Sequence, residues 1–308
     1  MEKKVKNSIY ILLILASLML MGQTGCATTP TSTTSTPTLG TTPSTSASNQ
    51  GLDFGLISGV GYLSEGITIN QGDTFRVVVH IENSEKVSKS GQICVKDDIE
   101  DVYGGIPSNP SQCLPFTVPE ARFDQSGKIS TSGQVDIPFP SQSDYYAYHD
   151  FLVTQQAHVY LTAQYTENSV IKSGDAGVAV PTPQTETISL IQDPAPVSLS
   201  VQKSVSPRAD GYLVDLGISL NNQVSNAEIW SPDFKSKGVQ FMPALGSNNL
   251  DCGLTSNILS MDSSTRYIKC SALVPSQQTR YYLLVNLAYG VKLSKPITFT
   301  IRGVNQTA

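Results

Sequence analysis

Four carboxylates lie close together in the sequence, where they could bind calcium. They are Asp97, Asp98, Glu100 and Asp101. Ca²⁺ prefers several oxygen ligands in a flexible geometry, which the loops of a β-sandwich can provide. Their spacing does not match that of an EF-hand loop. We therefore expect a solvated acidic loop here, with calcium as the alternative and as the one cofactor that the residues suggest.

A tyrosine-rich segment follows about 45 residues later and carries Tyr145, Tyr146 and Tyr148. Tyrosine rings are rigid and amphipathic, and such surfaces bind both proteins and sugars. The three rings are therefore a candidate binding surface. The alternative is that they cover an edge or an end of a folded sheet.

The chain contains five cysteines. If Cys26 carries a lipid, four remain, and the spacing predicts the disulfides Cys94–Cys113 and Cys252–Cys270 in an oxidising compartment. Buried free thiols are the alternative. Since the sequence has no C-x-x-C motif and its three histidines are scattered, we expect no zinc site.

The sequence carries no recognisable catalytic motif. It lacks the G-x-S-x-G, H-E-x-x-H and P-loop patterns, so we expect a non-enzymatic protein without catalytic residues. The net charge is -5, and no long run of Lys or Arg occurs after the N-terminus. Nucleic-acid binding needs a basic face, so that class of partner is not expected.

The N-terminus has the pattern of an export signal. Lys3, Lys4 and Lys6 precede an apolar run from Ile9 to Met21, which is shorter than the roughly 20 residues of a spanning helix. We therefore expect residues 1–26 to be a signal peptide. An uncleaved helix that anchors the chain in the membrane is the alternative.

The end of this run, Gln23-Thr24-Gly25-Cys26, resembles a lipobox. Small residues precede the cysteine as in that motif, although an aliphatic residue is usual at the position of Gln23. The resemblance implies lipid attachment at Cys26, and a diacyl chain there would supply two-chain anchoring. Cleavage elsewhere, with Cys26 discarded or free, is the alternative.

Residues 27–51 are mostly Thr, Ser and Pro. Such a segment cannot bury enough apolar surface to offset its chain entropy, so we expect a disordered stalk. At the other end of the chain, Asn305 begins a single N-glycosylation sequon.

Beyond the stalk, apolar and polar residues alternate with period two. In the range 74–82, Phe75, Val77, Val79 and Ile81 share one phase, which predicts a half-buried strand. The same alternation recurs over residues 158–165, 212–220 and 281–289. Turn residues predict breaks at several places, including Tyr289-Gly290.

Each half of this region contains a long strand ending in Asn, a cysteine pair, and a later strand closing on an aromatic residue. The Pro-containing segment 192–196 separates the halves. The sequence therefore predicts an all-β fold of two tandem immunoglobulin-like antiparallel sandwiches, at residues 52–192 and 193–308.

Two stretches resemble archaeal-type CARDB/immunoglobulin-like cell-surface modules. They are GITINQGDTFRVVVHIENSEKVSKSGQICV at residues 66–95 and YYLLVNLAYGVKLSKPITFTI at residues 281–301. The resemblance covers most of residues 55–303 as a pattern. It implies an extracellular adhesion or scaffolding module from an archaeon, with no catalytic signature.

The leading hypothesis is a membrane-anchored, exported binding or scaffolding protein on the outer face of the cell membrane. It would contact protein or glycan partners through loops and strand edges. The alternatives are a solute- or glycan-binding lipoprotein, and an accessory subunit of an envelope or secretion complex.

Overall fold

A computed structural model describes residues 51–108, 112–141, 145–180, 182, 184–193, 195–275 and 279–304. The described chain is built from β-strands and contains one short 3-10 turn at Asp101–Tyr103, with no α-helix among these residues. The predicted all-β, antiparallel sandwich class is confirmed. The signal segment, most of the stalk, Cys26 and Asn305 lie outside the described residues.

In chain order, a first set of strands precedes the expected boundary at residues 192/193 and a second set follows it. The first set is β1 (Leu52–Leu56), β2 (Thr68–Asn70), β3 (Thr74–Phe75), β4 (Val77–Asn83), β5 (Lys89–Asp97), β6 (Gln112–Val118), β7 (Arg122–Phe123), β8 (Ile129–Thr131), β9 (Gly133–Phe139), β10 (Tyr146–Ala147), β11 (Gln155–Ser173), β12 (Val178–Ala179), β13 (Glu186–Ile188) and β14 (Leu190–Ile191). The second set is β15 (Val197–Arg208), β16 (Gly211–Asn222), β17 (Ala227–Trp230), β18 (Val239–Leu245), β19 (Asn248–Asn249), β20 (Ile258–Leu259), β21 (Thr265–Val274), β22 (Arg280–Tyr281) and β23 (Leu283–Arg302).

One group of strands, the first lobe, pairs β1, β4 and β9 in one sheet and β6, β5, β11 and the end of β23 in another. The predicted inward phase of β3 and β4 is confirmed, since Phe75, Val77, Val79 and Ile81 are buried. Inward residues of β11, such as Leu161, are buried as well. Period-two burial of this kind is what a sandwich needs on each inner face.

The second lobe pairs β13, β15, β16 and β21 in one sheet. The other sheet contains β17, β18 and the beginning of β23. The long alternating strand β16 buries Val214, Leu216, Ile218 and Leu220, as its sequence predicts. The buried side chains of both lobes belong to one continuous apolar cluster.

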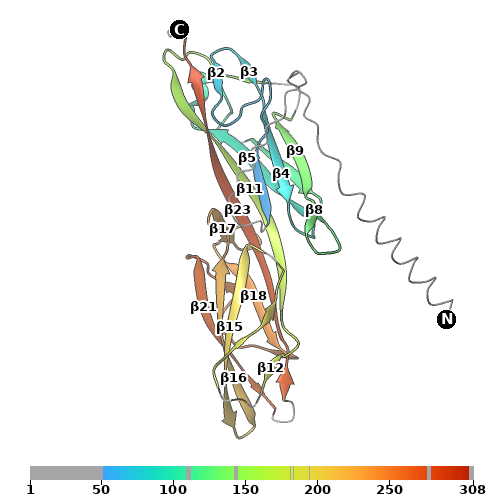
Figure 1. Ribbon diagram of the computed structural model, residues 1–308. Helices are drawn as coiled ribbons and strands as arrows, with labels where there is room; N and C mark the ends of the chain where they lie inside the picture. Colours follow the sequence, from blue (N-terminus) through green and yellow to red (C-terminus); the bar gives the residue numbers. More distant parts are fainter. Residues whose placement is uncertain are drawn as a thin grey trace, which may run out of the picture. The chain divides into compact units, whose positions relative to one another are not determined.

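The two lobes share a two-stranded ribbon. Strands β11 and β23 pair antiparallel from Gln155↔Ile301 to Lys172↔Leu284, and Figure 1 shows them running side by side. One half of β11 also pairs with β5, while the beginning of β23 pairs with β18. Main-chain pairing therefore crosses the expected boundary at residues 192/193, and the described residues from 51 onward belong to one compact unit.

The predicted turn at Tyr289-Gly290 is wrong, because β23 continues through both residues to Arg302. A Cβ atom built on Gly290 would lie 2.6 Å from Cε1 of Phe234. Glycine is needed here for the close approach of an aromatic ring, which is a recognised role of glycine inside a strand. The long strand β11 likewise continues past Tyr165 to Ser173.

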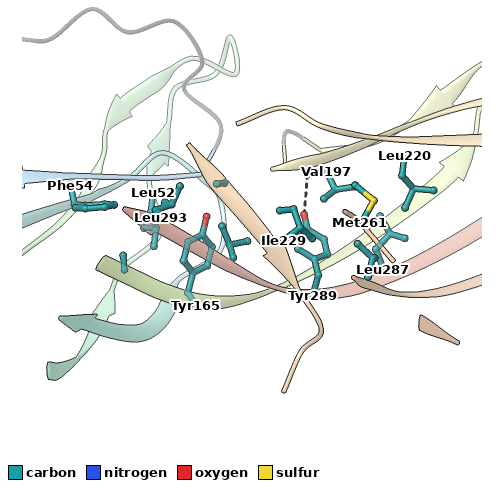
Figure 2. Close-up of a cluster of buried hydrophobic side chains, with 14 of the residues drawn as sticks. Leu52, Phe54, Tyr165, Val197, Leu220, Ile229, Met261, Leu287, Tyr289 and Leu293 are labelled. Atoms are coloured by element: carbon teal, nitrogen blue, oxygen red, sulfur yellow. Dashed lines mark hydrogen bonds between the residues drawn. The ribbon is translucent and has the colours of Figure 1, made fainter. Parts of the chain in front are cut away.

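Tyr165 and Tyr289 lie in the core where the two lobes meet (Figure 2). The backbone N–H of Val197 donates a hydrogen bond to the Tyr289 hydroxyl at 3.3 Å. Apolar side chains from both lobes surround the rings, among them Leu52 and Leu287. The ribbon therefore supplies core residues to both lobes at once.

Candidate functional site

The tyrosine-rich segment supplies mainly core residues. Tyr148 is fully buried, and its ring stacks on Phe75 and Phe299 with centroids 5.1 Å and 5.8 Å apart. Tyr146 is buried as well, and only Tyr145 is exposed. The prediction of a three-tyrosine binding surface is therefore wrong for Tyr146, which lies in β10, and for Tyr148 just beyond it, because both rings pack against Phe75 in the first lobe.

Asp97, the first residue of the acidic cluster, supports this part of the core. Its carboxylate accepts hydrogen bonds from the Tyr148 hydroxyl at 2.8 Å and from the backbone N–H groups of Ile99 and Ile106. Burial raises the pKa of Asp97, and the hydrogen bonds oppose that shift in part. The carboxylate therefore serves to position the chain around Tyr148.

The other acidic residues point to separate partners. Asp98 accepts hydrogen bonds from His158, through its backbone N–H and through Nδ1 at 2.8 Å, whereas Asp101 accepts one from the Ser108 backbone. Glu100 precedes the 3-10 turn. Within the described ranges, no group of three or more His, Cys, Asp or Glu side chains could hold a metal ion. Calcium binding by these carboxylates stays a prediction.

Both predicted disulfides are formed, Cys94–Cys113 and Cys252–Cys270. Cys94 and Cys113 lie directly opposite each other on β5 and β6, so this bond joins neighbouring strands of one sheet. Disulfides persist in oxidising environments, and the pair therefore indicates an extracellular type of compartment.

The outer face of the ribbon carries an unusual combination of side chains. Residues opposite each other on paired strands point to the same face of a sheet. Lys96 lies opposite Tyr160, Cys94 opposite Thr162, and Gln164 opposite Lys292. The period-two alternation over residues 158–165 puts Tyr160, Thr162 and Gln164 on the outward phase. It gives no means to identify their neighbours on β5 and β23.

These residues line an open surface depression of about 380 Å³, which we call the outer hollow. Its lining consists of Cys94, Lys96, Cys113, Tyr160, Thr162, Gln164, Lys292 and Ser294. The lining comes from four adjacent strands, β6, β5, β11 and β23. A second open depression of about 240 Å³ lies beside Glu228 and Lys237.

Two lysines of the outer hollow lie near aromatic rings. Lys96 Nζ is 5.6 Å from the centroid of the Tyr160 ring, and Lys292 Nζ is 6.0 Å from that of Trp230. Such ammonium–aromatic contacts stabilise the lysine positions modestly at exposed sites. Neither lysine forms an ion pair with a carboxylate of the described residues.

Trp230 is fixed at one end of this face. Its indole Nε1 donates to Glu228 at 3.2 Å, and Lys237 pairs with the same carboxylate at 3.2 Å. Desolvation alone would raise the pKa of Glu228, but hydrogen bonds from Lys237 and Trp230 and the charges of Lys237 and Lys292 lower it overall. Glu228 therefore stays ionised, and it neutralises Lys237 more directly than Lys292.

The chain matches no protein-family model and no curated protein. The described part of the chain contains no helix that is long and apolar enough to cross a membrane.

Proposed function

We propose that this chain is a non-enzymatic, membrane-anchored binding or scaffolding protein of the cell surface, and that it binds its partner through the outer hollow. The two disulfides support an oxidising environment outside the cytoplasm. Anchoring through Cys26, or through a retained N-terminal helix, and a stalk at residues 27–51 would hold the folded part away from the membrane.

The outer hollow is the observation that carries this proposal. The outward face of a solvated sheet normally bears scattered polar residues. Here Lys96, Lys292 and Tyr160 converge on one depression with short hydroxyl and amide side chains. Convergent polar groups beside an aromatic ring are the usual composition of a recognition site.

The open geometry favours surface contact over the enclosure of a small solute. A solute-binding lipoprotein would surround most of its ligand, as pockets for small molecules do. The outer hollow is instead open to solvent and lies on the face of a sheet. A partner that extends beyond the depression, such as a polymer or another surface protein, fits this geometry best.

Binding of the full-length mature protein to isolated cell envelopes tests the proposal. The double variant Lys96→Glu/Lys292→Glu should lose about tenfold in envelope binding, because it replaces both cations of the hollow with carboxylates. The matched control Lys128→Glu/Lys269→Glu makes the same change in net charge away from the hollow and should bind like the wild type. Equal binding by wild type and both variants would show that the outer hollow is not the contact surface.

A further inference from the structure

The outer hollow contains groups suited to a hydroxyl-rich ligand. Thr162, Gln164 and Ser294 offer hydroxyl and amide groups that can both donate and accept hydrogen bonds. The hydroxyls of Thr162 and Ser294 are 3.4 Å apart, which is a long hydrogen bond that leaves further capacity at both oxygens. Sugars present many hydroxyls at similar spacings and can satisfy such groups.

The charge of the outer hollow specifies an anion. Lys96 and Lys292 both line it, and neither ammonium group lies within ion-pair distance of a carboxylate among the described residues, although Glu228 lies opposite Lys292 on β17. The chain as a whole carries a net charge of -5. Lysines without a direct ion pair in a negatively charged protein are complementary to a negatively charged ligand. A lysine ammonium acts as a point charge with three rotatable donors, so it suits a single carboxylate without demanding one orientation.

Two other kinds of anionic partner fit the outer hollow less well. Nucleic acids need a longer basic track than two lysines provide. An anionic membrane surface would favour neighbouring apolar side chains that insert between lipids, and none of the exposed large apolar residues found in the described ranges lines the hollow. An open, polar depression with one aromatic ring is better suited to a carbohydrate.

The outer hollow is also held rigid. Its side chains come from four hydrogen-bonded strands, and the Cys94–Cys113 bond crosses two of them inside the lining itself. Rigid sites lose less conformational entropy when they bind. A polymer that makes only weak individual contacts therefore binds more tightly to such a preformed surface.

We propose that the outer hollow binds a carboxylated polysaccharide. Lys96 and Lys292 pair with carboxylates of the sugar chain, Tyr160 packs against a sugar ring, and Thr162, Gln164 and Ser294 bind its hydroxyls. This inference rests on the proposed function, since it names the ligand of the same surface.

Calorimetric titration of the full-length mature protein with hexagalacturonate tests this ligand class. The methyl-esterified hexamer, which has the same sugar backbone without charge, should bind about tenfold more weakly, because it lacks the carboxylates. Binding of the acidic hexamer should also weaken as salt rises from 50 to 500 mM, since exposed ion pairs are screened.

Variants locate the site. Lys96→Gln/Lys292→Gln should weaken hexagalacturonate binding about tenfold, and Tyr160→Ala should weaken it several-fold. The control Lys128→Gln/Lys269→Gln should leave binding unchanged, and all variants should keep the wild-type melting temperature. Equal binding of both hexamers, or equal losses in the control and the outer-hollow variants, would overturn the proposal.

Two results separate failure of this inference from failure of the proposed function. If hexagalacturonate does not bind while Lys96→Glu/Lys292→Glu still weakens envelope binding about tenfold, the ligand class is wrong and the binding surface stands. Vesicles containing phosphatidylglycerol provide the second comparison. If the protein binds these vesicles through Lys96 and Lys292 but does not bind hexagalacturonate, the ligand is a lipid headgroup and the polysaccharide is excluded.

Discussion

Lys89 and Glu167 form a buried ion pair, with 5% and 6% of their side-chain surfaces exposed. Lys89 also lies 2.6 Å from Glu85, so one ammonium group serves two carboxylates. Glu167 lies opposite Tyr289 in the shared ribbon, in the region where the two lobes meet. The charges of this group therefore affect the core that both lobes share.

The environment of Glu167 disfavours its ionised form. Desolvation is the main cause, and the nearby Glu85 adds repulsion, so the pKa of Glu167 is raised although Lys89 opposes the shift. One oxygen of Glu85 is buried without a hydrogen-bond partner among the described residues. Buried ionic groups of this kind depend strongly on their counter-ion.

Replacing Lys89 with Met should destabilise the protein by about 3–5 kcal/mol at neutral pH, because the buried Glu167 and the half-buried Glu85 would lose the cation that they share. Urea unfolding followed by intrinsic fluorescence measures the change. Lys128→Met, which removes an exposed lysine, should cost less than about 0.5 kcal/mol. Similar midpoints for the two variants would show that Lys89 does not stabilise the junction.

The raised pKa of Glu167 predicts a pH dependence. Between pH 4.5 and the higher pKa of the folded state, the folded protein binds a proton that the unfolded chain releases, so stability increases as pH falls. The gain is complete below pH 4.5 and is lost as pH rises through the folded pKa. Glu167→Gln cannot titrate and should lack this contribution.

The difference in unfolding free energy between wild type and Glu167→Gln isolates this effect, since all other titrating groups occur in both proteins. Measured from pH 7.5 to pH 4, the difference should move in favour of the wild type as the solution is acidified. The opposite slope would mean that pairing with Lys89 outweighs desolvation.

Tyr148 and Tyr146 allow a matched comparison of two buried hydroxyls. Tyr148→Phe removes the hydrogen bond to buried Asp97 and should cost about 1–3 kcal/mol. The Tyr146 hydroxyl is buried with no partner among the described residues, so Tyr146→Phe should be neutral or slightly stabilising. Thermal unfolding of both variants provides the test, and equal losses would contradict the assignment of these hydroxyls.

The long strands and the disulfides could be predicted from the sequence because both depend on local information. Period-two alternation reveals which side chains of a strand are buried, as the inward phase of β16 shows. Cysteine number and spacing were sufficient to pair Cys94 with Cys113 and Cys252 with Cys270.

The pairing of β11 with β23 could not be predicted in this way. A period-two strand has the same pattern whichever strand lies beside it, and Gln155 and Ile301 are paired across almost half of the sequence. The expected split at residues 192/193 followed from the linker composition alone. The outer hollow was missed for the same reason, because its lysines and Tyr160 become neighbours only through this register.

Each disulfide should stabilise the protein by about 3 kcal/mol, because it restricts the unfolded chain by closing a loop. The bonded cysteines are 19 and 18 residues apart in the sequence. Cys94→Ser/Cys113→Ser and Cys252→Ser/Cys270→Ser, compared by urea unfolding, test the two bonds separately.

Because the first bond also forms part of the outer hollow, its loss should weaken hexagalacturonate binding, whereas loss of the second should not. Labelling of the four cysteines of these bonds in the native, untreated protein would contradict both bonds and the oxidising environment that they indicate.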